Sequence, residues 1–162
     1  MSELGDLSEK LGKLLLVQKK FIAVAESCTG GWVAKCLTDV AGSSGWFERG
    51  FVTYSNAAKR EMLGVPAATL EAHGAVSEPT VLAMAEGALQ HSHAGVAVAI
   101  SGIAGPGGAG PGKPVGTVCM AWCEAGGRSR VETRHFAGDR AAVRRQAVQH
   151  ALGGLLELLQ DG

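Results

Sequence analysis

Ser27 lies in a short run of small polar residues whose types and spacing could carry chemistry. The run, ESCTGG at 26–31, follows the apolar segment 21–25 and precedes a helical pattern over 32–39. A strand–turn–helix unit of this kind places a hydroxyl beside N–H groups that lack partners in the first helical turn. It predicts a phosphate site or a nucleophilic serine beside oxyanion donors, while an ordinary serine N-cap explains the same pattern. Neither a GxSxG nor a GKS/GKT signature is present, so the motif leaves these alternatives open.

A serine nucleophile needs a base, and the sequence offers Lys59. Lys59 ends the segment YSNAAK at 54–59, which follows a second predicted strand and contains Tyr54, the only tyrosine of the chain. A lysine can act as a base when burial or a nearby positive charge lowers its pKa. The Tyr54 hydroxyl could pass a proton or hold the substrate. A solvated lysine and a packing tyrosine are the alternatives, and Cys28 is a rival nucleophile next to Ser27.

Three arginines stand at the start of the last predicted helix, in GDRAAVRRQ at 138–146. Asp139 is a suitable N-cap. Arg140 follows in the first turn, where a positive charge opposes the helix dipole, and this indicates another use, such as a clamp on a phosphate or carboxylate. Arg144 and Arg145 fit a solvated helix face equally well.

The cysteines and histidines do not have the spacing of a metal site. Cys28, Cys36, Cys119 and Cys123 form no CxxC pair, and the five histidines form no HExxH. Cys119 and Cys123 stand four residues apart on one face of a predicted strand. We expect them to be small buried thiols.

Length and composition narrow the class of protein. The 162 residues, 46% of them hydrophobic, predict one domain, 1–162, with its own core. Fifteen Lys and Arg balance fifteen Asp and Glu, which argues against a dedicated nucleic-acid binder. No apolar stretch approaches the roughly 20 residues of a membrane span, and the N-terminus lacks a secretory signal. We therefore expect a cytoplasmic protein with neither nucleic-acid nor membrane partners.

Hydrophobic periodicity predicts βα units followed by an antiparallel hairpin, and therefore a mixed sheet covered by helices. The expected strands are 21–25, 49–55, 95–101, 115–123 and 128–136, and the loop 101–114 is too rich in Gly and Pro for regular structure. The expected helices are 7–20, 32–39, 56–63, 66–72, 77–91 and 139–160.

Five motifs in order resemble one family. They are AESCTGG (25–31), GFVTYSNAAK (50–59), HGAVSEP (73–79), SGIAGPGG (101–108) with KPVGTV (113–118), and GDRAAVRRQ (138–146). The chain is similar over nearly its whole length to the nicotinamide-nucleotide amidase family, also known as the C-terminal domain of the competence/damage-inducible protein CinA. It looks like the stand-alone form, without the molybdopterin-binding-like domain that precedes many members.

The resemblance implies a three-layer α/β/α sandwich with a mixed sheet and hydrolysis of nicotinamide mononucleotide to nicotinate mononucleotide and ammonia, within NAD salvage. It implies no cofactor, and a homodimer or higher homo-oligomer. By the same resemblance the catalytic residues are Ser27, Lys59 and Tyr54. The expected substrate-binding residues are Thr29, Gly30, Gly31, Asn56, Ser101, Gly102, Gly105 and Arg140 or Arg145.

The hypothesis is that Lys59 takes the Ser27 proton as the hydroxyl attacks the carboxamide, with N–H groups near Thr29 and Gly30 meeting the oxyanion. Backbone amides of 101–105 and the arginine are the candidates for the 5′-phosphate. The competing hypothesis is a non-catalytic nucleotide-binding regulatory module. A phosphoryl-transfer enzyme is disfavoured because no magnesium-binding carboxylate pair stands out.

Overall fold

The computed structural model describes residues 2–161 and contains one five-stranded sheet. The strand order is β2-β1-β3-β4-β5, with β1 parallel to β2 and β3 and the β3–β4 and β4–β5 pairs antiparallel. The strands are β1 (Ile22–Glu26), β2 (Phe47–Val52), β3 (Val96–Gly102), β4 (Thr117–Glu124) and β5 (Ser129–His135). The predicted mixed sheet and its final hairpin are confirmed.

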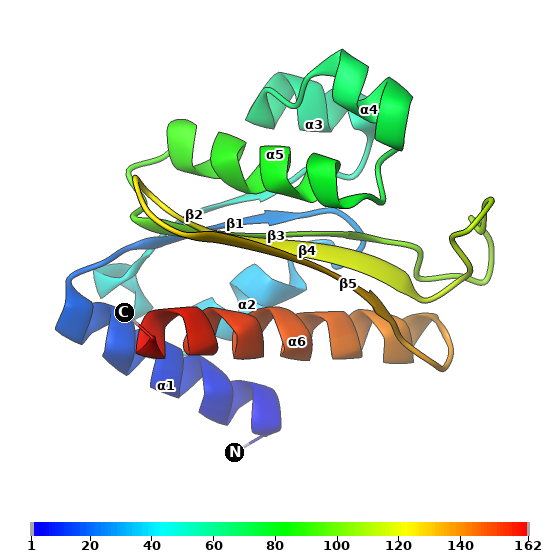
Figure 1. The fold of residues 1–162 in the computed structure, drawn as a ribbon. Coiled ribbons are helices and arrows are strands. Elements are labelled where there is room, and N and C mark those ends of the chain that lie inside the picture. The colour runs from blue at the N-terminus through cyan, green and yellow to red at the C-terminus, as the bar shows by residue number, and fades with distance from the viewer. Residues whose placement is uncertain (1, 162) are drawn as a thin grey trace.

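Helices cover both faces of the sheet, which makes the predicted α/β/α sandwich (Figure 1). One layer holds α1 (Glu3–Gln18), α2 (Trp32–Thr38) and α6 (Arg140–Gln160), and the other holds α3 (Asn56–Leu63), α4 (Ala67–His73) and α5 (Glu78–Gln90). A single 3-10 turn, η1 (Ser43–Gly45), precedes β2. Within residues 2–161 no helix combines the length and apolar character needed to cross a bilayer.

The two faces of the central strands are chemically different. In β1, Ile22 and Val24 join the core under α1 and α6, whereas Ala23 and Ala25 join the core under α5. β3 repeats this alternation, with valine and isoleucine on one side and alanine on the other. Because side chains alternate along a strand, the small residues all face α5, and that helix can approach the sheet closely.

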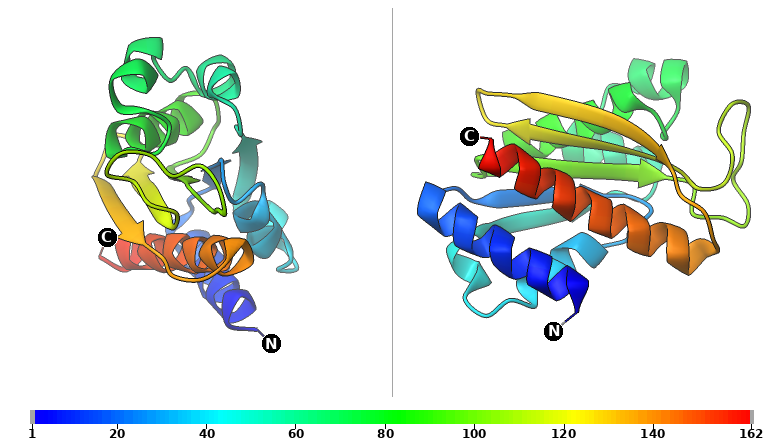
Figure 2. Two further views of the ribbon diagram at one scale, coloured as in Figure 1. Left: turned by 90° about the vertical axis from the view of Figure 1, so that its right-hand side faces the viewer. Right: turned by 60° about the horizontal axis from the view of Figure 1, so that its bottom comes forward.

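Helix α6 lies close to the sheet because Gly154 faces Trp122 of β4. A Cβ atom at position 154 would overlap the Trp122 ring, and the indole Nε1 donates to the carbonyl of Ala151 at 2.9 Å. The contact sets the distance between α6 and the sheet. Its N-terminal turn then reaches the loops at the end of the sheet (Figure 2, right).

Two predicted boundaries differ from the structure by three residues or more. The first helix begins at Glu3 rather than 7, because the Ser2 side chain accepts a hydrogen bond from Gly5 N–H and caps it. The second strand ends at Val52 rather than 55. The carbonyls of Thr53 and Tyr54 accept hydrogen bonds from the Lys59 amine instead of continuing the sheet.

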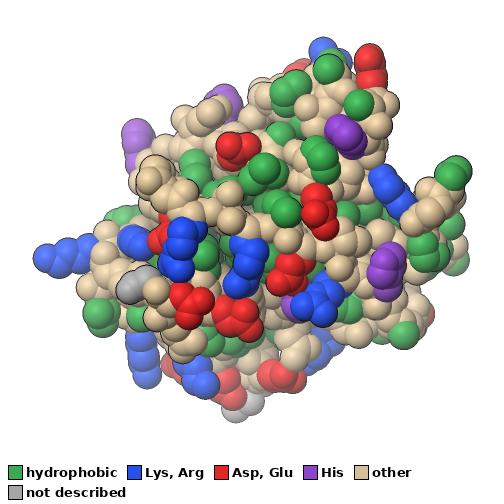
Figure 3. Space-filling view, in the orientation of Figure 1, with side chains coloured by type: hydrophobic (Ala, Val, Ile, Leu, Met, Phe, Trp, Pro, Cys, Tyr) green, Lys and Arg blue, Asp and Glu red, His purple; other side chains and the backbone are tan. Residues whose placement is uncertain are grey.

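Charged side chains of both signs mix over the face drawn in Figure 3. Along β5 and α6 they form ion pairs, among them Arg134–Glu132 and Arg130–Glu157. This face carries no extended patch of one charge. The four cysteines are buried free thiols, which confirms the prediction made for Cys119 and Cys123.

Candidate active site

A cavity of about 290 Å³ opens at the end of the sheet where the parallel strands finish. Strand β1 lies between β2 and β3, so the chain leaves β1 on one side for β2 and crosses to the other side for β3. In open α/β sheets, ligand sites form at such a reversal, beyond the carboxyl ends of the strands. The wall of the cavity is made from the loops after β1, β2 and β3, together with the start of α6.

Ser27 and Lys59 meet in the cavity wall. The Lys59 Nζ atom lies 2.9 Å from the Ser27 Oγ atom, although the residues are 32 positions apart in the chain. The amine also donates to the carbonyls of Thr53 at 2.9 Å and Tyr54 at 3.2 Å. Helix α3 holds Lys59 in place, since the Ser55 side chain caps the helix by accepting from Ala58 N–H.

Burial makes Lys59 an unusual lysine. Its side chain is 1% exposed, and no carboxylate contacts the amine among the described residues. Removal from water penalises the charged form, so burial lowers the pKa of Lys59 below its ordinary value of 10.5. The alternative of a solvated lysine is therefore wrong for this position.

Tyr54 occupies a different place from the one expected for a proton carrier. The side chain is 61% exposed, and its hydroxyl accepts a hydrogen bond from Arg140 at 3.1 Å. The tyrosine backbone carbonyl, rather than its phenol, contacts the Ser27 hydroxyl and the Lys59 amine. Arg140 also donates to the carbonyl of Gly105 at 2.9 Å, so its guanidinium joins two walls of the cavity.

The glycine-rich loop after β3 supplies another wall. Ser101, Gly102 and Gly105 line the cavity, as the sequence placed them. Gly105 has φ +86°, and a side chain there would collide with Val115, so glycine is required. Ala75 and Val76, in the loop before α5, complete the opposite side.

The other predicted substrate-binding residues do not line the cavity. The Thr29 side chain is buried against Glu26, and Gly30 N–H donates to the Ser27 carbonyl at 3.1 Å. Gly31 is the N-cap position of α2, and Asn56 and Arg145 are exposed. Exposure of Arg145 agrees with a solvated helix face and makes Arg140 the arginine of the cavity wall.

The carboxylate of Glu26 was missed in the sequence. Its Oε1 atom accepts from the Thr29 hydroxyl at 2.6 Å and Val33 N–H at 2.9 Å, and Oε2 accepts from Ala34 N–H at 3.0 Å. The first N–H groups of α2 are therefore occupied, and Gly31 makes no side-chain cap. An ionisable residue that ends an otherwise apolar strand is the signal that could have revealed this cap. The interpretation of Ser27 as an N-cap is therefore wrong. The prediction of a phosphate site at the start of α2 is also wrong, because Glu26 occupies the N–H groups there.

We expect Glu26→Gln to lower the free energy of unfolding by about 1–3 kcal/mol, because an amide group would replace one acceptor oxygen against buried donors. Urea denaturation measures the change. Glu61→Gln, on the exposed face of α3, is the matched control and should change stability little. Equal stability of the two variants would contradict the capping role.

Comparison with known proteins identifies the family. The profile of the CinA C-terminal domain matches residues 4–159. This chain belongs to that family. The nicotinamide-nucleotide amidohydrolase PncC of Escherichia coli K12 is 58% identical over 93% of the chain and 92% of the relative. A protein of the same name from Pseudomonas putida is 52% identical over 98% of both.

Solved structures of the CinA family share the fold. A competence/damage-inducible protein from Agrobacterium tumefaciens superposes with a TM-score of 0.94 at 43% identity, covering 98% of this chain and 96% of that one. A CinA superfamily protein from Klebsiella pneumoniae gives a TM-score of 0.95 at 39% identity, covering 99% and 100%. The CinA-like protein of Akkermansia muciniphila is 60% identical over 83% of this chain, which spans only 33% of that longer protein.

In this CinA-family domain, no group of three or more His, Cys, Asp or Glu side chains within 2–161 is placed to hold a metal ion. Cys28 lines the cavity beside Ser27, and burial raises the pKa of its thiol to about 11. The thiolate is the reactive form of cysteine, so the thiol is a weak nucleophile at neutral pH.

Proposed function

We propose that this chain hydrolyses the carboxamide of nicotinamide mononucleotide to give nicotinate mononucleotide and ammonia, a reaction of NAD salvage. The names of the relatives from Escherichia coli and Pseudomonas putida support the substrate and the reaction. The observation that carries the proposal is the buried amine of Lys59 at 2.9 Å from the Ser27 hydroxyl, in the wall of a cavity. A nucleophile with an adjacent base is the arrangement that acyl transfer requires.

The hydrogen bonds of Lys59 suit a neutral base. A neutral amine has two N–H groups and one lone pair. The two N–H groups can satisfy the carbonyls of Thr53 and Tyr54, which leaves the lone pair directed at the Ser27 hydroxyl. In this protonation state Lys59 accepts the hydroxyl proton as the serine oxygen attacks the carboxamide carbon.

The proposed reaction then proceeds through an ester of Ser27. The bond from Oγ to the carbonyl carbon forms, and the bond from that carbon to the amide nitrogen breaks. Lys59 returns its proton to the departing nitrogen, which leaves as ammonia. Water, with Lys59 again as the base, cleaves the ester to the carboxylate and restores Ser27. The positive charge of the pyridinium ring favours attack and helps to keep Lys59 neutral.

The remaining walls offer groups for the substrate. The Arg140 guanidinium and backbone amides of 101–105 other than that of Ile103 are the candidates for the phosphate, because Ile103 N–H already donates to the Thr117 carbonyl at 2.8 Å. Arg140 lies at the cavity and offers two N–H-bearing nitrogens there. To bind phosphate, Arg140 would exchange contacts with Tyr54 or Gly105. Near Ser27, the N–H groups of Cys28 and Thr29 have no acceptor on another residue within 2–161, and we assign them to the oxyanion.

Turnover tests the proposal. The purified chain is incubated with nicotinamide mononucleotide, ammonia is measured by a coupled assay, and nicotinate mononucleotide is identified by chromatography. We expect equal amounts of the two products over many turnovers. Intact nucleotide after long incubation at high protein concentration would instead support the non-catalytic binding module.

Cys28→Ala should retain kcat within about threefold of wild type, because the thiol is protonated at neutral pH and the alanine leaves the backbone N–H in place. Steady-state ammonia release checks this. A loss of several orders of magnitude, with Ser27→Ala still active, would make Cys28 the nucleophile instead.

A further inference from the structure

Arg144 lies one helical turn after Arg140 on α6, and its guanidinium is held by the turn that carries Ser27. The Nε atom donates to the carbonyl of Cys28 at 3.0 Å, and one terminal nitrogen donates to the carbonyl of Thr29 at 3.2 Å. The guanidinium carbon lies 5.5 Å from the centroid of the Trp32 ring, so a cation–π contact fixes the group from α2. Arg144 is thus not part of a solvated helix face.

The two carbonyls belong to the peptide units that provide the N–H groups of Thr29 and Gly30. A peptide unit is planar, and its N–H points opposite to its carbonyl. A cation bound to the carbonyl oxygens therefore fixes the direction of both N–H groups. It also makes the N–H a stronger donor, because hydrogen bonds polarise one another.

The two N–H groups have different tasks. That of Gly30 closes the turn on the Ser27 carbonyl, at 3.1 Å. That of Thr29 has no acceptor within 2–161 and is one of the two donors assigned above to the oxyanion. Arg144 itself is absent from the cavity wall, so it can act on the reaction only through this backbone.

We infer that Arg144 is a positioning residue, which holds the Ser27 turn so that its hydroxyl and its unpaired N–H groups are aligned for the transition state. The inference rests on the proposed amidase function. Since Arg144 does not touch the bound nucleotide, its loss should reduce kcat and leave KM nearly unchanged. A residue that merely stabilised the fold would lower the unfolding temperature without this pattern.

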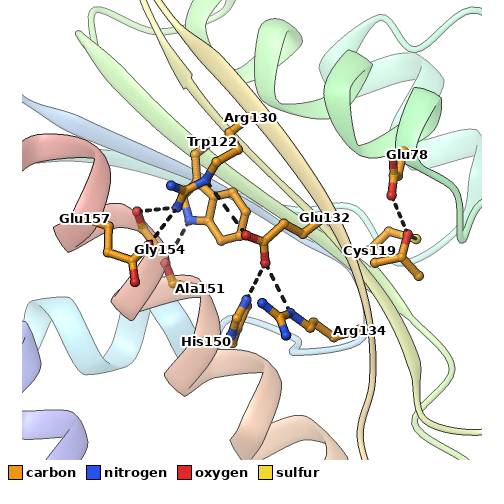
Figure 4. A network of polar contacts seen from close by, with 11 residues as sticks. Glu78, Cys119, Trp122, Arg130, Glu132, Arg134, His150, Ala151, Gly154 and Glu157 are labelled. Atoms are coloured by element: carbon orange, nitrogen blue, oxygen red, sulfur yellow. Dashed lines mark hydrogen bonds and ion pairs between the residues drawn. The ribbon is translucent and has the colours of Figure 1, made fainter. Parts of the chain in front are cut away.

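Arg130 provides a matched control on the same helix interface. It also donates to a backbone carbonyl, that of Gly154 at 3.1 Å, and its guanidinium lies 4.9 Å from the Trp122 ring centroid (Figure 4). These contacts resemble those of Arg144, but they join β5 to the middle of α6, away from the cavity. Arg130→Gln therefore removes comparable contacts, together with the ion pair to Glu157, without touching the Ser27 turn.

The experiment compares Arg144→Gln with Arg130→Gln and wild type. We expect kcat of Arg144→Gln to fall about 10- to 100-fold, which does not exceed the reduction in kcat caused by losing one oxyanion donor. We expect its KM to stay within about threefold of the wild-type value. Arg130→Gln should keep kcat within about twofold. Arg144→Lys, whose ammonium lacks the fork needed for both carbonyls, should lie between Arg144→Gln and wild type, and it replaces the Gln variant if that variant does not fold.

Hydrogen exchange of the segment 26–33 supplies a readout that does not depend on activity. We expect faster exchange there in Arg144→Gln and unchanged exchange in Arg130→Gln. Near-normal kcat and exchange in Arg144→Gln, or equal losses in both Gln variants, would overturn the inference. If the wild-type protein is inactive but exchange is faster in Arg144→Gln, the proposed function is wrong, whereas the conclusion that Arg144 positions the turn stands.

Discussion

Ser27→Ala is expected to lower kcat on nicotinamide mononucleotide by about 10⁴-fold or more, because the alanine lacks the hydroxyl that forms the proposed ester. Ser27 is 8% exposed, and its hydroxyl is the side-chain oxygen in contact with the buried Lys59 amine. Measured ammonia release, with a folding check by circular dichroism, tests the result. The alanine leaves the cavity walls intact, so binding of the nucleotide should persist and separate catalysis from affinity.

Ser129→Ala is the matched control for Ser27→Ala, since it removes an exposed serine hydroxyl on β5. It should behave as wild type. Activity of Ser27→Ala within tenfold of wild type would remove the serine from the mechanism, whereas the fold assignment would stand.

Lys59→Met should lower kcat by about 10³-fold or more, because methionine fills the buried space but cannot accept a proton. In wild type, kcat/KM should rise with pH and level off above the folded-state pKa of Lys59, since only the neutral amine acts as a base. Burial lowers that pKa, so the midpoint of the rise lies below 10.5. A methionine variant with the wild-type rate and pH profile would exclude Lys59 as the base.

The same pKa affects stability in a defined direction. Between the lowered folded-state pKa and the unfolded value near 10.5, the unfolded chain binds more protons than the folded chain. The free energy of unfolding therefore rises with pH through this window in wild type. Lys59→Met lacks this contribution, so its stability relative to wild type should be greatest at low pH and decline as pH rises. Urea denaturation at several pH values measures the difference.

The sequence predicted the elements well because hydrophobic periodicity dominates them. The strand 95–101 has an uninterrupted apolar core, and it corresponds to β3 with a shift of one residue. The end of the second strand was wrong because Lys59 withdraws two carbonyls from the sheet, and periodicity does not report such a contact.

The candidate site was predictable only in part. The chemistry of Ser27 and Lys59, together with the family resemblance, predicted a pair that the fold brings within 2.9 Å. The roles of Glu26 and Arg144 depend on backbone groups, which carry no sequence signal of their own. The backbone partners of Glu26 are N–H groups in the first turn of α2, and those of Arg144 are carbonyls of the Ser27 turn, so the folded chain shows what these two side chains hold in place.

Because Gly154 has no side chain, α6 can lie close to β4, and this distance affects the candidate active site at the other end of the helix. Helix α6 packs on the Trp122 ring at this point, and Arg140 and Arg144 lie at the other end of the same helix. A side chain at position 154 would tilt α6 and move the guanidinium groups of Arg140 and Arg144 away from the loops that they contact. The choice of residue at position 154 is therefore restricted by the contacts that Arg140 and Arg144 must make, as well as by local packing.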